Sequence, residues 1–148
     1  MPLDHSYVGR DYPVPEPYLV SREKIREFAE AIGATDAAYV DRDAARALGY
    51  PDVIAPPTFA ITVIGLGAQL MISDESLGLN FGRVVHGDQR FEYTRPIAAG
   101  DQLTCVVYID EITSRGGHDF LTYRGEVRTT AGEPVVTGRT RLVIRGDQ

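Results

Sequence analysis

The sequence contains very little cysteine. Of its 148 residues only Cys105 is a cysteine, so no disulfide can form within the chain. The cysteine and the three histidines do not have the spacing of a metal-binding motif. We therefore expect no metal, and an unpaired cysteine fits the reducing cytoplasm as the place where the protein acts.

Positive charge and long apolar segments are also scarce. The chain has 15 lysines and arginines against 21 acidic residues, a net charge of −6, which disfavours nucleic acid or an anionic membrane as the main partner. The first 17 residues include acidic residues and four prolines, and they lack the apolar segment of a signal peptide. Pro56, Pro57, Gly65 and Gly67 interrupt the longest uncharged run, residues 53–73, so we predict a buried helix there and no membrane span.

Helical signals dominate the first half of the chain. Ser21 is a predicted N-cap, and apolar residues then recur at helical spacing from Ile25 until Gly33 ends the helix. Asp41 is the predicted N-cap of a second, short helix that Gly49 ends. The third helix follows Pro57 and is apolar on nearly all sides, so protein should surround most of it.

Alternating patterns replace helical ones after residue 78. Four strands are predicted at about 83–94, 101–112, 118–130 and 134–145, each with one apolar and one polar face, as in antiparallel sheets. Helices followed by antiparallel strands indicate an α+β protein, in which a long central helix lies on a curled sheet. We expect one domain over residues 1–148, with residues 1–17 as an extended arm.

Two segments carry a family resemblance. Residues 28–58, FAEAIGATDAAYVDRDAARALGYPDVIAPPT, resemble the N-terminal signature of MaoC-like (R)-specific hydratases and 3-hydroxyacyl dehydratases. Residues 90–103, RFEYTRPIAAGDQL, resemble the strand and turn that follow in that family. The chain is most similar to the non-catalytic HadA-type subunit of actinobacterial (3R)-hydroxyacyl-ACP dehydratases and to FAS1-like dehydratase domains. The resemblance implies a hot-dog fold.

The resemblance also implies which catalytic groups are missing. In the family, an Asp and a His at a dimer interface act as base and acid, and a backbone N–H at the start of the central helix binds the thioester carbonyl. Ala34 and Tyr39 stand at the Asp and His positions, and Pro56-Pro57 replaces His-Gly at the helix start. Alanine cannot accept a proton, a phenol is a poor base near neutral pH, and proline has no N–H.

Three residues remain as weak catalytic candidates. Asp36 lies two positions from Ala34, although an Asp in this context is more often a cap or turn residue. Tyr39 could bind substrate or simply pack. His86 is predicted on a solvated strand face, unless a bulge at Gly87 redirects its side chain. That solvated face would be shared with Asp88, Arg90 and Glu92.

The resemblance thus predicts an accessory subunit that binds substrate and completes a catalytic partner. The acyl-ACP or acyl-CoA substrate would contact six residues near the start of the central helix, with no cofactor needed. These residues are Tyr39, Pro56, Pro57, Thr58, Phe59 and Thr62. Three alternatives stay open: a homodimeric enoyl-thioester hydratase or thioesterase with a rearranged site, an acyl-binding protein without turnover, and a purely structural homodimer. The sequence does not reveal the acyl-chain length.

Overall fold

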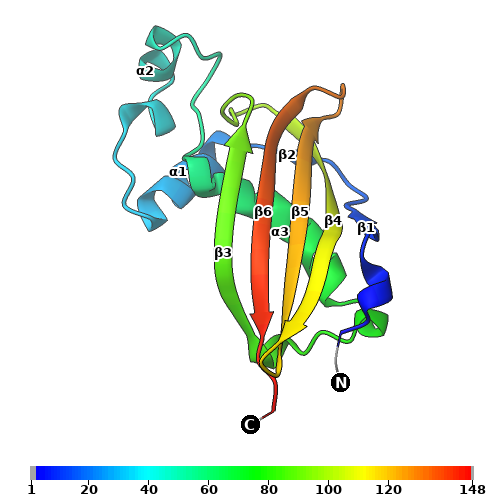
Figure 1. Ribbon diagram of the computed structural model, residues 1–148. Helices are drawn as coiled ribbons and strands as arrows, with labels where there is room; N and C mark the ends of the chain where they lie inside the picture. The colour runs from blue at the N-terminus through cyan, green and yellow to red at the C-terminus, as the bar shows by residue number, and fades with distance from the viewer. Residues whose placement is uncertain (1–2, 148) are drawn as a thin grey trace.

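The computed structural model describes residues 3–147, which form an antiparallel sheet with one long helix across it (Figure 1). The helices and strands have the following bounds. They are β1 (Asp11–Pro13), β2 (Tyr18–Leu19), α1 (Arg22–Ala31), α2 (Arg42–Ala47), α3 (Ala60–Ile72), β3 (Val84–Tyr93), β4 (Gln102–Arg115), β5 (His118–Thr129) and β6 (Pro134–Ile144). Short 3-10 turns lie between them at His5–Tyr7, Ala37–Tyr39, Pro57–Phe59, Glu75–Leu77 and Phe81–Arg83.

The sheet has the order β1-β4-β5-β6-β3, and β2 pairs with β4 beside β1. All strand pairs are antiparallel, as the alternating patterns predict. The four long strands agree with the predicted ranges to within a few residues. β3 is an edge strand, and within the described chain only β6 pairs with it.

The N-terminal arm joins the sheet. Its Asp11–Pro13 segment pairs with β4, and Tyr12 is buried with its hydroxyl donating to Asp74 at 2.8 Å. The missed strands are only two and three residues long, too short for alternation to show. Their pairing depends on the exposed edge of β4, a neighbour that is distant in the sequence.

The predicted helix caps are confirmed. The Ser21 hydroxyl accepts a hydrogen bond from the Lys24 N–H at 3.1 Å, and Asp41 caps α2. Gly33 has φ +69°, a left-handed conformation that glycine adopts without strain, and it follows the end of α1. Local sequence signals therefore determine where these helices begin and end.

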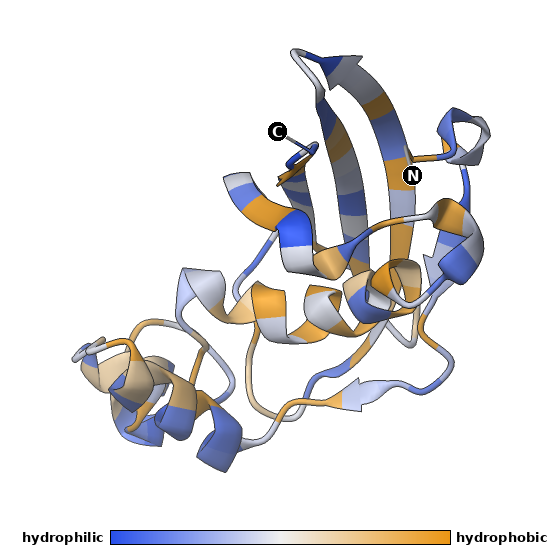
Figure 2. Cartoon of the chain, turned by 90° about the horizontal axis from the view of Figure 1, so that it is seen from below, coloured by the Kyte–Doolittle hydropathy of each residue, from blue (hydrophilic) through white to orange (hydrophobic). Residues whose placement is uncertain are grey.

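Glycines let α3 lie unusually close to the sheet. Ile64 packs over Gly125 and Gly138, which face each other on β5 and β6. A Cβ at Gly125 would lie 2.5 Å from Cγ2 of Ile64, and a Cβ at Gly67 would lie 2.6 Å from Cγ2 of Val107 on β4. The helix and the sheet thus interlock at positions without side chains. Figure 2 shows the apolar character of α3, which lies below the strands in that view.

One face of α3 is open, contrary to the expectation that protein surrounds most of the helix. Leu66 is 43% exposed and Leu70 is 40% exposed, and Ile61, Thr62 and Gly65 on the same side are only partly buried. The sheet covers the opposite side of the helix. Within residues 3–147, no helix is long and apolar enough to cross a membrane.

The segment of residues 21–52, which we call the helical lobe, projects beyond the β3 side of the sheet (Figure 1). Asp52 ties the lobe together because its carboxylate accepts from Arg22 Nε at 3.0 Å and Arg22 Nη2 at 2.8 Å. Arg42 lies 3.8 Å from the same carboxylate. The hydrogen bonds from Arg22 hold the pKa of Asp52 at about 2.

The interlock between α3 and β5 predicts that Gly125→Ala destabilises the protein. The added methyl group collides with Ile64, and overpacking of this kind costs about 1–3 kcal/mol. The measurement is the free energy of unfolding in urea. Gly65→Ala is the matched control, because a Cβ there meets no atom within 4 Å and helix propensity favours alanine. An unchanged midpoint for Gly125→Ala would contradict the interlock.

The Asp52 contacts predict an acid-dependent stability. The folded-state pKa of about 2 lies below the unfolded value of about 3.9, so this contribution is complete above the unfolded value and is lost as pH falls toward 2. We expect Asp52→Asn to be less stable than wild type near neutral pH, with the difference shrinking between about pH 4 and pH 2. Urea unfolding at several pH values measures this, and a pH-independent difference would contradict it.

Candidate functional site

A small apolar cavity lies where the helical lobe meets the start of α3 and the end of β3. Its volume is about 250 Å³. Six residues line it: Tyr39, Ile54, Ala55, Pro57, Tyr93 and Pro96. None of the six carries a carboxylate, imidazole or thiol. The cavity therefore suits hydrocarbon, and no general base with an ordinary pKa near neutrality faces it.

The walls of the cavity are fixed by short backbone contacts between segments that are distant in sequence. Ile54 forms an isolated antiparallel bridge with Ala98, and the Ala55 N–H donates to the Ile97 carbonyl at 2.7 Å. The Ile54 N–H donates to the Ala38 carbonyl at 3.1 Å, which holds the turn that carries Tyr39. These contacts make the cavity a preformed part of the fold.

The turn after β3 is held by an ion pair. Arg95 Nη1 and Nη2 bind the Asp101 carboxylate at 2.8 and 3.0 Å, and that carboxylate also accepts from the Ala98 N–H at 2.9 Å. Arg95 Nε reaches Glu133 at 2.8 Å. The hydrogen bonds with Asp101 raise the pKa of Arg95, so the guanidinium stays charged. The predicted turn is confirmed, and it presents Pro96 to the cavity.

Tyr93 is the polar element of the cavity. It ends β3, and its register opposite Val136 places it on the sheet face that is turned toward α3. Its hydroxyl donates a hydrogen bond to the Pro57 carbonyl. Burial raises the pKa of Tyr93 to about 12, although a hydrogen bond from the Ala60 backbone acts in the opposite direction. The phenol is therefore protonated at neutral pH and cannot act as a base.

The predicted substrate-binding residues separate into two groups. Tyr39 and Pro57 line the cavity. Phe59 is fully buried in the core, where its ring meets the edges of Phe28 and Tyr18, so the structure places it away from the cavity wall. The other three do not line the cavity: Pro56 is buried, Thr58 is exposed, and Thr62 lies on the open face of α3.

Sequence reasoning missed four residues of the cavity: Ile54, Ala55, Tyr93 and Pro96. The alternation of residues in β3 shows that Tyr93 faces inward with Phe91, but it does not show what lies opposite. The resemblance pointed to Tyr39, which stands at the His position of the family. Proximity to the helix start was the signal for Pro57, and it also applied to Ile54 and Ala55.

Asp36 has the structural role that its sequence context favours. Its carboxylate caps the turn Ala37–Tyr39 by accepting from the Ala38 N–H at 2.9 Å, and its side chain is exposed. It does not line the cavity.

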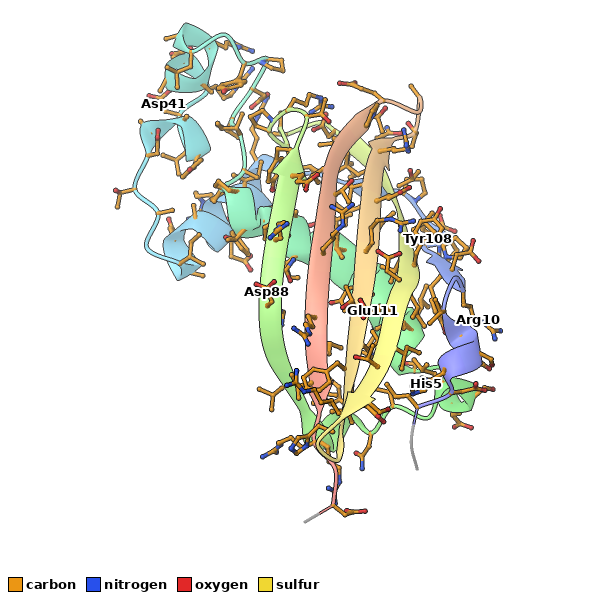
Figure 3. All side chains as sticks on the ribbon, in the orientation of Figure 1. His5, Arg10, Asp41, Asp88, Tyr108 and Glu111 are labelled. Atoms are coloured by element: carbon orange, nitrogen blue, oxygen red, sulfur yellow. The ribbon has the colours of Figure 1, made fainter. Side chains whose placement is uncertain are left out.

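His86 is redirected by a bulge. The register of β3 against β6 shifts between His86 and Asp88, so His86 lies opposite Leu142 and shares the sheet face of that core residue. Asp88 lies opposite Arg141 on the other face, and Figure 3 shows it on the edge strand. Gln89 secures the register below the bulge, because its amide accepts from the buried Thr140 hydroxyl at 2.7 Å and donates to the Arg139 carbonyl at 3.2 Å.

The three catalytic candidates are not brought together within one chain. His86 is exposed and lies near the start of β3, whereas Tyr93 and the cavity lie at its end. Seven residues of extended strand separate them, which corresponds to roughly 20 Å. Asp36 and Tyr39 share a turn, yet only Tyr39 reaches the cavity. Among residues 3–147, the cavity lining therefore does not include the paired acid and base of the family.

Comparison with known proteins places this geometry in a family. The family model of the FAS1-like, dehydratase domain region matches residues 6–138. A UPF0336 protein of Streptomyces coelicolor is 57% identical over 145 residues, which cover 98% of this chain and 97% of that protein. A UPF0336 protein of Leifsonia xyli is 47% identical over 148 residues, covering 100% of this chain and 99% of that protein.

Solved structures of similar proteins support the same family. A chain of the C-terminally truncated HadBC (3R-hydroxyacyl-ACP dehydratase) complex from Mycobacterium tuberculosis has a TM-score of 0.84 and 30% identity, with 93% of this chain and 96% of that chain covered. A MaoC-like dehydratase has a TM-score of 0.86 and 32% identity, and the match covers 96% of this chain but 43% of that one. The helix on its antiparallel sheet is thus a hot-dog fold, and the chain belongs to the FAS1-like dehydratase domain family of MaoC-like hot-dog proteins.

Proposed function

We propose that this chain is the accessory, substrate-binding subunit of a (3R)-hydroxyacyl thioester dehydratase of fatty-acid elongation. A second hot-dog chain supplies the catalytic Asp and His. One observation carries the proposal: the preformed cavity at the start of α3 is apolar and has no acid or base among its lining residues.

The chemistry explains why a partner is needed. Dehydration of a 3-hydroxyacyl thioester removes a proton from the α-carbon and protonates the departing hydroxyl, so it needs a base and an acid with suitable pKa values. The Tyr93 phenol, with a pKa of about 12, is too weakly acidic, and Asp36 is exposed and committed to a cap. The cavity can still hold the acyl chain while another subunit provides the proton transfers.

The surface supports a partner of the same fold. The edge strand β3 offers unpaired backbone groups, and α3 has an open face with Leu66 and Leu70 on the side away from the sheet. A second hot-dog chain that pairs along β3 would extend the sheet and cover that helix face. The HadBC complex of Mycobacterium tuberculosis is a (3R)-hydroxyacyl-ACP dehydratase, and this chain resembles one of its chains at 30% identity.

The decisive experiment compares turnover with and without a partner. The purified chain is assayed for hydration of a trans-2-enoyl-CoA by following the loss of the conjugated thioester absorbance. We expect no turnover from the chain alone, and turnover when a hot-dog chain of the same organism that carries the Asp/His pair is co-purified with it. Replacing the partner's Asp with Asn should abolish that activity. Reproducible turnover by the isolated chain would overturn the proposal.

The interface predicts a separate effect on assembly. Leu66→Glu places a charge on the open face of α3, and burying that charge against a partner should weaken association at least about tenfold. Because Leu66 is exposed in the free chain, the variant should fold normally. Analytical ultracentrifugation measures the association. Leu19→Glu is the matched control, since Leu19 is 64% exposed on β2, which pairs with β4, away from β3. Equal weakening by both variants would contradict this interface.

A further inference from the structure

The Tyr93 hydroxyl forms a hydrogen bond with a backbone group just before α3. That group would otherwise be available to bind a ligand. The hydroxyl donates to the Pro57 carbonyl. Pro56 and Pro57 have no N–H to offer. A carbonyl or hydroxyl of a ligand that reached this wall would therefore meet groups that are already paired.

The remaining walls are apolar. Ile54, Ala55, Pro57 and Pro96 present hydrocarbon, and Tyr39 and Tyr93 contribute aromatic rings. A polar ligand group that enters such a cavity loses its hydrogen bonds to water without replacing them. An apolar pocket rejects an otherwise identical ligand with an added hydroxyl by about 100-fold at most.

We infer that Tyr93 is a specificity-determining residue, which reserves the cavity for the unsubstituted hydrocarbon of an acyl chain and excludes chains with a polar terminus. The inference rests on the proposed function, because it identifies the part of the substrate that this subunit holds. Tyr93 acts through the hydrogen bonds of its hydroxyl, and its ring supplies part of the apolar wall.

The Tyr93→Phe variant tests the role of the Tyr93 hydroxyl. Removal of the hydroxyl frees the Pro57 carbonyl from this hydrogen bond while the ring remains. The terminal hydroxyl of an ω-hydroxyacyl chain can then donate to that carbonyl, as the phenol did. The variant should gain affinity for the hydroxylated ligand, which a general loss of packing would not produce.

The test measures binding of decanoyl-CoA and 10-hydroxydecanoyl-CoA by calorimetry, to the purified chain and to its complex with the Asp/His-bearing partner. We expect wild type to prefer decanoyl-CoA by about 10- to 100-fold. In Tyr93→Phe this preference should fall to about threefold or less, mainly through tighter binding of the hydroxylated ligand. Tyr108→Phe is the matched control, because it removes a phenol hydroxyl from β4, outside the cavity lining, and it should keep the wild-type preference.

The outcomes separate this inference from the proposed function. Equal binding of both ligands by wild type, an unchanged preference in Tyr93→Phe, or no binding of either ligand to chain or complex would overturn the role of Tyr93. Enoyl-CoA turnover by the complex would stand in each of these cases. The reverse result, selective binding without partner-dependent turnover, would overturn the dehydratase subunit and leave Tyr93 as the selective residue of an acyl-binding protein.

Discussion

The contact between Ile64 and the two facing glycines of β5 and β6 determines the geometry of the rest of the molecule. Gly125 and Gly138 leave a gap in the sheet surface, and α3 settles into it through one branched side chain. The position of α3 then determines where its first turn lies. Because Pro57 is in the 3-10 turn that leads into this first turn and Tyr93 ends β3, the position of the helix brings together two residues of the cavity lining.

Two of the altered positions of the family signature meet in space. Tyr39 and Pro57, which stand where the resemblance expects a catalytic His and the helix-start glycine, line the same cavity. These two changes therefore fall in one site, whose lining is apolar. Such a site suits hydrocarbon, and it supports the proposal that a partner chain performs the chemistry.

Local patterns predicted the long elements of the fold and few of the contacts between them. Ser21, Asp41 and Gly33 act within their own helices, so capping rules located them correctly. The cavity instead joins residues 39, 54–57 and 93–96, and alternation identifies the face of a strand but not its neighbour. The sequence also showed that α3 is apolar on nearly all sides. The apolar pattern does not encode whether the same chain or a second chain covers these side chains of α3, because that depends on the assembly.

The free edge of β3 affects how the unpaired protein would be recognised in the cell. An unpaired strand is a template for indiscriminate association, and β3 resists it with a bulge at Gly87 and with the alternating charges of Asp88, Arg90 and Glu92. These features discourage wrong neighbours, but they do not hide Leu66 or Leu70. An orphan copy would thus display the features by which chaperones and proteases identify incomplete assemblies. Its abundance would then be limited by synthesis of whatever protein completes that edge.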